Sequence, residues 1–185
     1  MAVLTLANQL TLLRMLLIPA FVILIVYGEM GWALITFLVA GITDALDGLI
    51  ARWAGQKTTL GAWLDPMADK LLLISTFIVL TLPGIGLVSR IPLWLTVCLI
   101  SRDITIVLTV IVVNLAIGRR TFRPTLLGKV ATGVYVLTGL VFLVVNYLGR
   151  TSAATDVMVS LSLIITIISA LHYIRHAGRI ISEGT

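Results

Sequence analysis

The sequence predicts an all-α integral membrane protein, a bundle of six transmembrane helices with both termini in the cytoplasm. Of its 185 residues, 59% are hydrophobic and only 11% are charged, whereas soluble domains carry about 25% charged residues. The mean hydropathy of +1.14 agrees with this class. Six apolar runs, each close to the ~20 residues that cross a bilayer, lie at 9–27, 32–54, 62–82, 91–117, 125–148 and 156–176.

The loops between these runs are short, which predicts one compact membrane domain over residues 1–185. The first run is expected to stay in the mature protein, because Met1–Asn8 carries no positive segment typical of a cleaved signal. Cys98 is the sole cysteine, which excludes an intramolecular disulfide.

Basic residues predict the orientation of the bundle. Most of them fall near the N-terminus, in the second and fourth loops and near the C-terminus: Arg14, Arg52, Lys57, Arg119, Arg120, Arg123, Lys129, Arg175 and Arg179. The alternate loops hold only Arg90 and Arg150. Cytoplasmic loops are enriched in Lys and Arg, so both termini are expected in the cytoplasm. We interpret the net charge of +5 as a topology signal with some excess for anionic substrates, and we expect no nucleic-acid partner.

Four aspartates lie where the second and third apolar runs approach their shared cytoplasmic loop: Asp44, Asp47, Asp65 and Asp69. The first two are spaced i, i+3 and the last two i, i+4, so each pair lies along one stripe of its helix. Carboxylates at membrane depth are energetically expensive and mark functional sites. Because the connecting loop is short, we expect antiparallel neighbours whose acidic stripes face each other. Such hard oxygen ligands suit Mg²⁺, Mn²⁺ or Ca²⁺.

Small residues interrupt both acidic stripes, namely Gly48 and Ala51 on the second and Gly61 on the third. They leave room for a bulky ligand, although small residues also serve simple helix packing. Arg52 follows directly and could reach a phosphate oxygen; a purely topological role is the alternative.

The run D-x2-D-G-x2-A-R-x8-G-x3-D-x3-D, from Asp44 to Asp69, matches the signature of the CDP-alcohol phosphatidyltransferases at every defined position. The segment from Asn8 to Arg14 also resembles the N-x2-T-x2-R pattern of that family. The chain is therefore similar to this family over nearly its whole length.

This resemblance implies transfer of a phosphatidyl group from CDP-diacylglycerol to an alcohol with release of CMP, supported by two Mg²⁺ or Mn²⁺ ions. It implies that Asp44, Asp47 and Asp65 bind metal and that Asp69 is the general base and a further ligand. The CDP-lipid site would be lined by Asn8, Thr11, Gly48, Ala51, Arg52 and Gly61. The resemblance also implies a homodimer, and we expect a bacterial inner-membrane enzyme whose site faces the cytoplasm.

The alcohol that accepts the phosphatidyl group is predicted from basic residues outside the acidic motif. Arg102 lies inside the fourth run, and Arg119 and Lys129 belong to a cytoplasmic basic cluster. Such residues bind phosphate through charge-assisted hydrogen bonds, which favours glycerol 3-phosphate and a phosphatidylglycerophosphate product. An internal ion pair between Arg102 and Asp103 is the competing explanation. A cardiolipin synthase of the same family, with phosphatidylglycerol as acceptor, is the alternative function.

Two readings from other classes remain. A cation transporter also places aspartates on facing helices, but its site is expected near the bilayer midplane, and these acids gather toward one cytoplasmic loop. A silent membrane scaffold has no need of a complete acidic motif.

Overall fold

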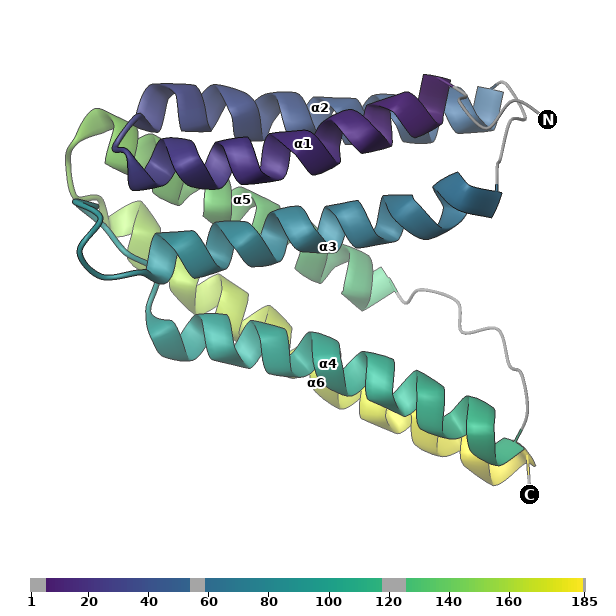
Figure 1. Ribbon diagram of the computed structural model, residues 1–185. Helices are drawn as coiled ribbons and strands as arrows, with labels where there is room; N and C mark the ends of the chain where they lie inside the picture. Colours follow the sequence, from purple (N-terminus) through teal and green to yellow (C-terminus); the bar gives the residue numbers. More distant parts are fainter. Residues whose placement is uncertain (1–5, 54–58, 118–125, 185) are drawn as a thin grey trace. The chain divides into compact units, whose positions relative to one another are not determined.

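The computed structural model is all-helical (Figure 1). It describes residues 6–53, 59–117 and 126–184, and within these ranges the chain forms six helices. They are α1 (Leu6–Val26), α2 (Met30–Trp53), α3 (Thr59–Thr81), α4 (Leu93–Ile117), α5 (Leu126–Leu148) and α6 (Ala153–Gly184). Each helix overlaps one predicted span, so the predicted helices and their order are confirmed. The last helix is longer than the predicted 156–176, because it continues through the polar segment after Arg175.

Length and composition make some of the helices candidates for crossing a membrane. Within the described residues, three stretches are long and apolar enough to cross a bilayer, at Gln9–Val26, Leu126–Leu148 and Ala153–Arg175. Large apolar side chains on the surface, such as Leu16 and Ile164, suit contact with lipid. The chain is thus a helical membrane protein, and the crossing of all six helices stays a prediction.

Contacts divide the chain into two compact units, residues 1–90 with 142–151 and residues 91–141 with 152–185. In the first unit α1 packs against both α2 and α3, and α1 and α2 run side by side in Figure 1. The aromatic rings of Phe21 and Phe37 meet between α1 and α2 with centroids 5.8 Å apart. Both rings are buried, so this contact anchors the first helix pair.

Glycine ends two helices of the first unit. At the end of α1, Gly28 has a φ of +79°; its N–H donates to the Ile25 carbonyl, and the N–H of Glu29 donates to the Leu24 carbonyl. This is a Schellman motif, which satisfies carbonyls that the helix end leaves open. Gly149 ends α5 in the same way, with a φ of +64°.

Asn146 attaches the end of α5 to the segment that follows α3. Its Nδ2 donates to the Ser89 carbonyl at 2.8 Å and to the Phe142 carbonyl, while its Oδ1 accepts from the Ser89 N–H at 3.1 Å. The side chain thereby satisfies both backbone groups of Ser89, as a paired strand would. This attachment explains why the last turns of α5 belong to the first unit.

The second unit contains α4 packed against α6 and side by side with it in Figure 1. Hydroxyl groups join α5 to α6: the Tyr135 hydroxyl lies 2.7 Å from Thr166 Oγ1, and Thr138 Oγ1 lies 2.8 Å from Ser162 Oγ. These four residues are buried. Hydrogen bonding between helices satisfies polar groups that lipid cannot.

Candidate active site

The first unit brings two of the four motif aspartates together around one arginine. Arg14 of α1 lies between Asp44 of α2 and Asp69 of α3. Its Nη1 lies 2.8 Å from Asp44 Oδ1 and donates to Asp69 Oδ1 at 2.7 Å. The sequence predicts that the acidic stripes of the second and third helices face one another. In the structure the common partner of Asp44 and Asp69 comes from a third helix, because α1 packs against both.

Burial is uneven across this cluster. The Arg14 side chain is 0% exposed, whereas the side chains of Asp44 and Asp69 are 41% and 43% exposed. A fully buried guanidinium needs a counter-charge, since an isolated charge pays a large desolvation penalty. The two carboxylates supply that charge on their inner side, and their remaining surface stays accessible to a ligand.

Arg14, predicted to be one of the cytoplasmic topology charges, has a different role in the structure. A topology anchor extends to the aqueous interface, but this side chain is fully buried. The signal was present in the sequence, because Arg14 lies inside an apolar run, three residues after Thr11. Thr11 is itself fully buried on α1, so Thr11 and Arg14 of this segment both contribute to the interior of the unit.

The described carboxylates fit a hard divalent cation. Two of their oxygens already converge on a single cationic nitrogen, which is the arrangement that metal coordination by Asp oxygens requires at shorter distances. Within the described residues no group of three or more potential ligands gathers. The other predicted ligands, Asp47 on α2 and Asp65 on α3, have side chains outside the described part.

The remaining predicted donor contacts also fall outside the described side chains. They are Asn8, Gly48, Ala51, Arg52 and Gly61, whose backbones belong to α1, α2 and α3. Their roles in binding a CDP-lipid stay predictions.

Of the predicted acceptor residues, Arg102 is engaged within the second unit. Its Nη1 donates to Asp103 Oδ1 at 2.7 Å and its Nε to Ser169 Oγ at 3.2 Å, and its side chain is 9% exposed. The internal ion pair that the sequence offered as the competing explanation is therefore present, and an acceptor phosphate would have to share the guanidinium with Asp103. Lys129 is exposed at the start of α5, and Arg119 lies outside the described residues.

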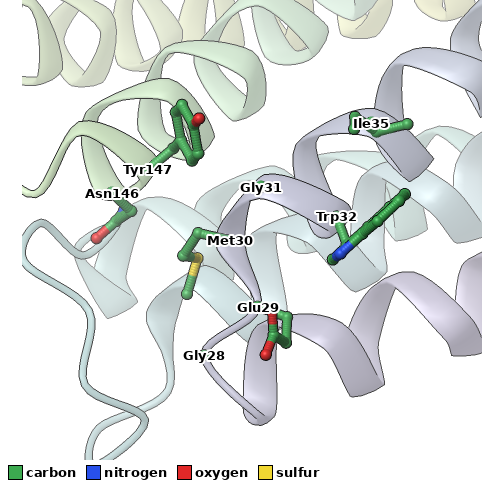
Figure 2. Close-up of a pocket in the computed structure, with 8 residues that line it drawn as sticks. All are labelled: Gly28, Glu29, Met30, Gly31, Trp32, Ile35, Asn146 and Tyr147. Atoms are coloured by element: carbon green, nitrogen blue, oxygen red, sulfur yellow. The ribbon is translucent and has the colours of Figure 1, made fainter.

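A cavity of about 470 Å³ lies elsewhere in the first unit, at the turn between α1 and α2 and the end of α5 (Figure 2). Its lining consists of Gly28, Glu29, Met30, Gly31, Trp32, Ile35, Asn146 and Tyr147. Glu29 and Asp44 are fifteen residues apart, with α2 running between them from Met30, so at 1.5 Å per residue the cavity is about 20 Å from the carboxylates. It holds one acidic side chain and is distinct from the acidic site.

The apolar helices and the two aspartates at the buried Arg14 are compatible with an enzyme that acts on a charged lipid headgroup. Comparison with known proteins identifies the family: the profile of the CDP-alcohol phosphatidyltransferases matches residues 4–170. The chain belongs to this family, and the resemblance seen in the motif is confirmed.

The chain resembles relatives that carry two different names. A "Probable phosphatidylglycerophosphate synthase" of Mycobacterium tuberculosis (strain ATCC 25618 / H37Rv) is 36% identical over 184 residues, covering 94% of this chain and 82% of the relative. The human "Cardiolipin synthase (CMP-forming)" is 35% identical, covering 72% and 48%. The corresponding Streptomyces coelicolor protein is 38% identical, covering 70% and 60%. The chain is thus a phosphatidyltransferase of phospholipid biosynthesis.

Proposed function

We propose that this protein transfers the phosphatidyl group of CDP-diacylglycerol to glycerol 3-phosphate, forming phosphatidylglycerophosphate and CMP. The observation that carries the proposal is the similarity to the mycobacterial relative, which extends over 94% of the chain and most of that relative. The two cardiolipin synthases cover less of the chain, and the chain covers 60% or less of their own length. The acidic motif and the paired carboxylates at Arg14 supply the chemistry.

In the proposed step the acceptor hydroxyl oxygen attacks the phosphorus that carries the diacylglycerol. A new P–O bond forms, the bond from that phosphorus to the CMP oxygen breaks, and the hydroxyl proton passes to Asp69. Asp69 suits this role because its carboxylate is held at one oxygen by Arg14 and is 43% exposed. A positioned base of this kind contributes about 10²–10⁴-fold to the rate.

Asp44 and Asp69, with Asp47 and Asp65, are proposed to hold Mg²⁺ or Mn²⁺, on which this family generally relies. When bound, two such ions offset the charge of the pyrophosphate and of the departing CMP. The protein's own contribution is to fix Asp44 of α2 and Asp69 of α3, to which the buried Arg14 of α1 is bound.

The membrane arrangement is part of the same proposal. With six spans and both termini in the cytoplasm, the acidic motif would lie at the inner leaflet of a bacterial inner membrane, where the donor's acyl chains stay in lipid and its nucleotide faces water. The whole chain acts as one catalytic domain in a homodimer, by analogy with the family.

Cardiolipin synthesis with phosphatidylglycerol as acceptor is the second candidate, favoured by the relatives that are named cardiolipin synthases. The acceptor phosphate separates the two functions, because Arg102 and Lys129 suit the phosphomonoester dianion of glycerol 3-phosphate. A cation transporter is disfavoured by family membership.

The deciding experiment supplies the purified full chain, in detergent with Mg²⁺, with CDP-diacylglycerol and one acceptor at a time. Mass spectrometry identifies the lipid, and CMP release measures the rate. We expect phosphatidylglycerophosphate from glycerol 3-phosphate. Cardiolipin from phosphatidylglycerol, with no product from glycerol 3-phosphate, would establish the second candidate instead.

A further inference from the structure

Arg14 has an environment that a substrate-binding or topology arginine does not need. Its side chain is 0% exposed, and one of its nitrogens, Nη1, lies within 2.8 Å of carboxylate oxygens from two other helices. Both oxygens belong to residues proposed to bind metal. The oxygen atoms that are proposed to bind metal are therefore already in contact with a positive charge, the guanidinium of Arg14.

We propose that Arg14 is a resident counter-ion of the acidic site, which holds Asp44 and Asp69 in place without metal and competes with divalent ions for their charge. This inference rests on the proposed function, because it takes the two aspartates as metal ligands. Arg14 acts through the aspartates and is a positioning residue.

The first consequence concerns the metal-free protein. Carboxylates that lie close together, as Asp44 and Asp69 do, repel one another, and burying them without partners is strongly unfavourable. Arg14 offsets part of this charge, while the side chains of Asp44 and Asp69 remain 41% and 43% exposed. The site is thereby preformed before metal arrives.

The second consequence concerns affinity. A unit positive charge within a few ångströms of a bound divalent ion repels it, and this repulsion is strong where water is scarce. Arg14 therefore weakens metal binding. A donor pyrophosphate adds negative charge to the site, so metal and donor are expected to bind together more tightly than metal alone.

The test measures Mn²⁺ binding to the full chain in detergent, without substrate, by electron paramagnetic resonance. The variant Arg14→Gln removes the charge and keeps a hydrogen-bonding side chain. We expect it to bind Mn²⁺ roughly tenfold more tightly than wild type, because solvent screening and rearrangement of the site reduce the effect of removing the charge. Its metal-free form is expected to unfold at a lower temperature, and Mn²⁺ to raise that temperature by more than in wild type.

Two further variants sharpen the comparison. Arg14→Lys keeps the charge and is expected to bind Mn²⁺ within about threefold of wild type. Arg150→Gln is the control, since it removes an exposed arginine of the first unit, just after α5, that has no proposed role; its Mn²⁺ affinity is expected to equal that of wild type.

If Arg14 only held the aspartates in position, its replacement would let their side chains move apart, and Mn²⁺ affinity would fall instead of rising. Equal or weaker Mn²⁺ binding by Arg14→Gln overturns the inference. If that variant does not fold, the comparison is made between Asp44→Asn and the double variant Asp44→Asn/Arg14→Gln, which removes one charge of each sign. The double variant must bind Mn²⁺ more tightly than the single one.

Failure of the proposed function is recognised separately. If the wild-type protein binds no Mn²⁺, the proposed metal dependence and this inference both fall. A lipid product other than phosphatidylglycerophosphate changes the assigned acceptor and leaves the expected order of Mn²⁺ affinities as it is.

Discussion

Replacing Asp69 with asparagine separates the chemistry of the carboxylate from its structural role. The amide oxygen of Asp69→Asn can still accept the hydrogen bond that Arg14 Nη1 donates at 2.7 Å, and Asp44 still neutralises that guanidinium. What is lost is the negative charge and the ability to take a proton.

The magnitude follows from these contacts. A hydrogen bond to a charged group contributes about 1.5–3 kcal/mol and a neutral one about 0.5–1.5 kcal/mol, so we expect a loss of roughly 1 kcal/mol in the free energy of unfolding. Turnover is expected to fall by about 10²–10⁴-fold, the contribution of a positioned general base. Activity thus falls far more than stability.

The assay follows CMP release from CDP-diacylglycerol with glycerol 3-phosphate, beside thermal unfolding of the same sample. Glu29→Gln is the control, because it makes the same chemical change in the same unit, at the separate cavity of Figure 2, and it is expected to keep wild-type turnover. An Asp69→Asn variant with wild-type turnover would refute the assignment of the base.

Four further outcomes are expected. Asn146→Ala leaves both backbone groups of Ser89 without their side-chain partner, and thermal unfolding should show a loss of about 1–3 kcal/mol; an unchanged unfolding temperature would contradict this attachment. A double-mutant cycle of Thr138→Val and Ser162→Ala should give a coupling of roughly 0.6 kcal/mol, because their hydroxyls lie 2.8 Å apart; strictly additive effects would exclude it. Gly28→Ala should lower stability by about 1 kcal/mol, since its φ of +79° is strained for a side chain although nothing lies within 4 Å of the added Cβ. Chelation with EDTA should abolish CMP release and Mn²⁺ should restore it, and full turnover in EDTA would remove metal from the proposal.

The helices and their order could be predicted from sequence because each is an apolar run of bilayer length, bounded by short polar loops. The end of α6 could not, because the polar residues after Arg175 no longer follow the apolar signal on which the prediction depended. Helix ends are set by local capping and polar contacts, which hydropathy does not measure.

The candidate site shows the same division. The spacing of the acidic motif was sufficient to predict the family and its class of chemistry, since these residues recur at helical intervals on two neighbouring segments. For Arg102 the sequence was compatible both with an ion pair to Asp103 and with binding of a phosphate. The ion pair with Asp103 is seen only in the structure.

Composition and periodic spacing are properties of the chain, so they were sufficient to predict an apolar helical protein with a phosphatidyltransferase motif. The position of Arg14 of α1 between Asp44 and Asp69 is visible only in the folded protein. Residues 30 and 55 positions apart meet there because α1 packs against both α2 and α3, and no pattern within a single helix specifies which buried charges share a partner.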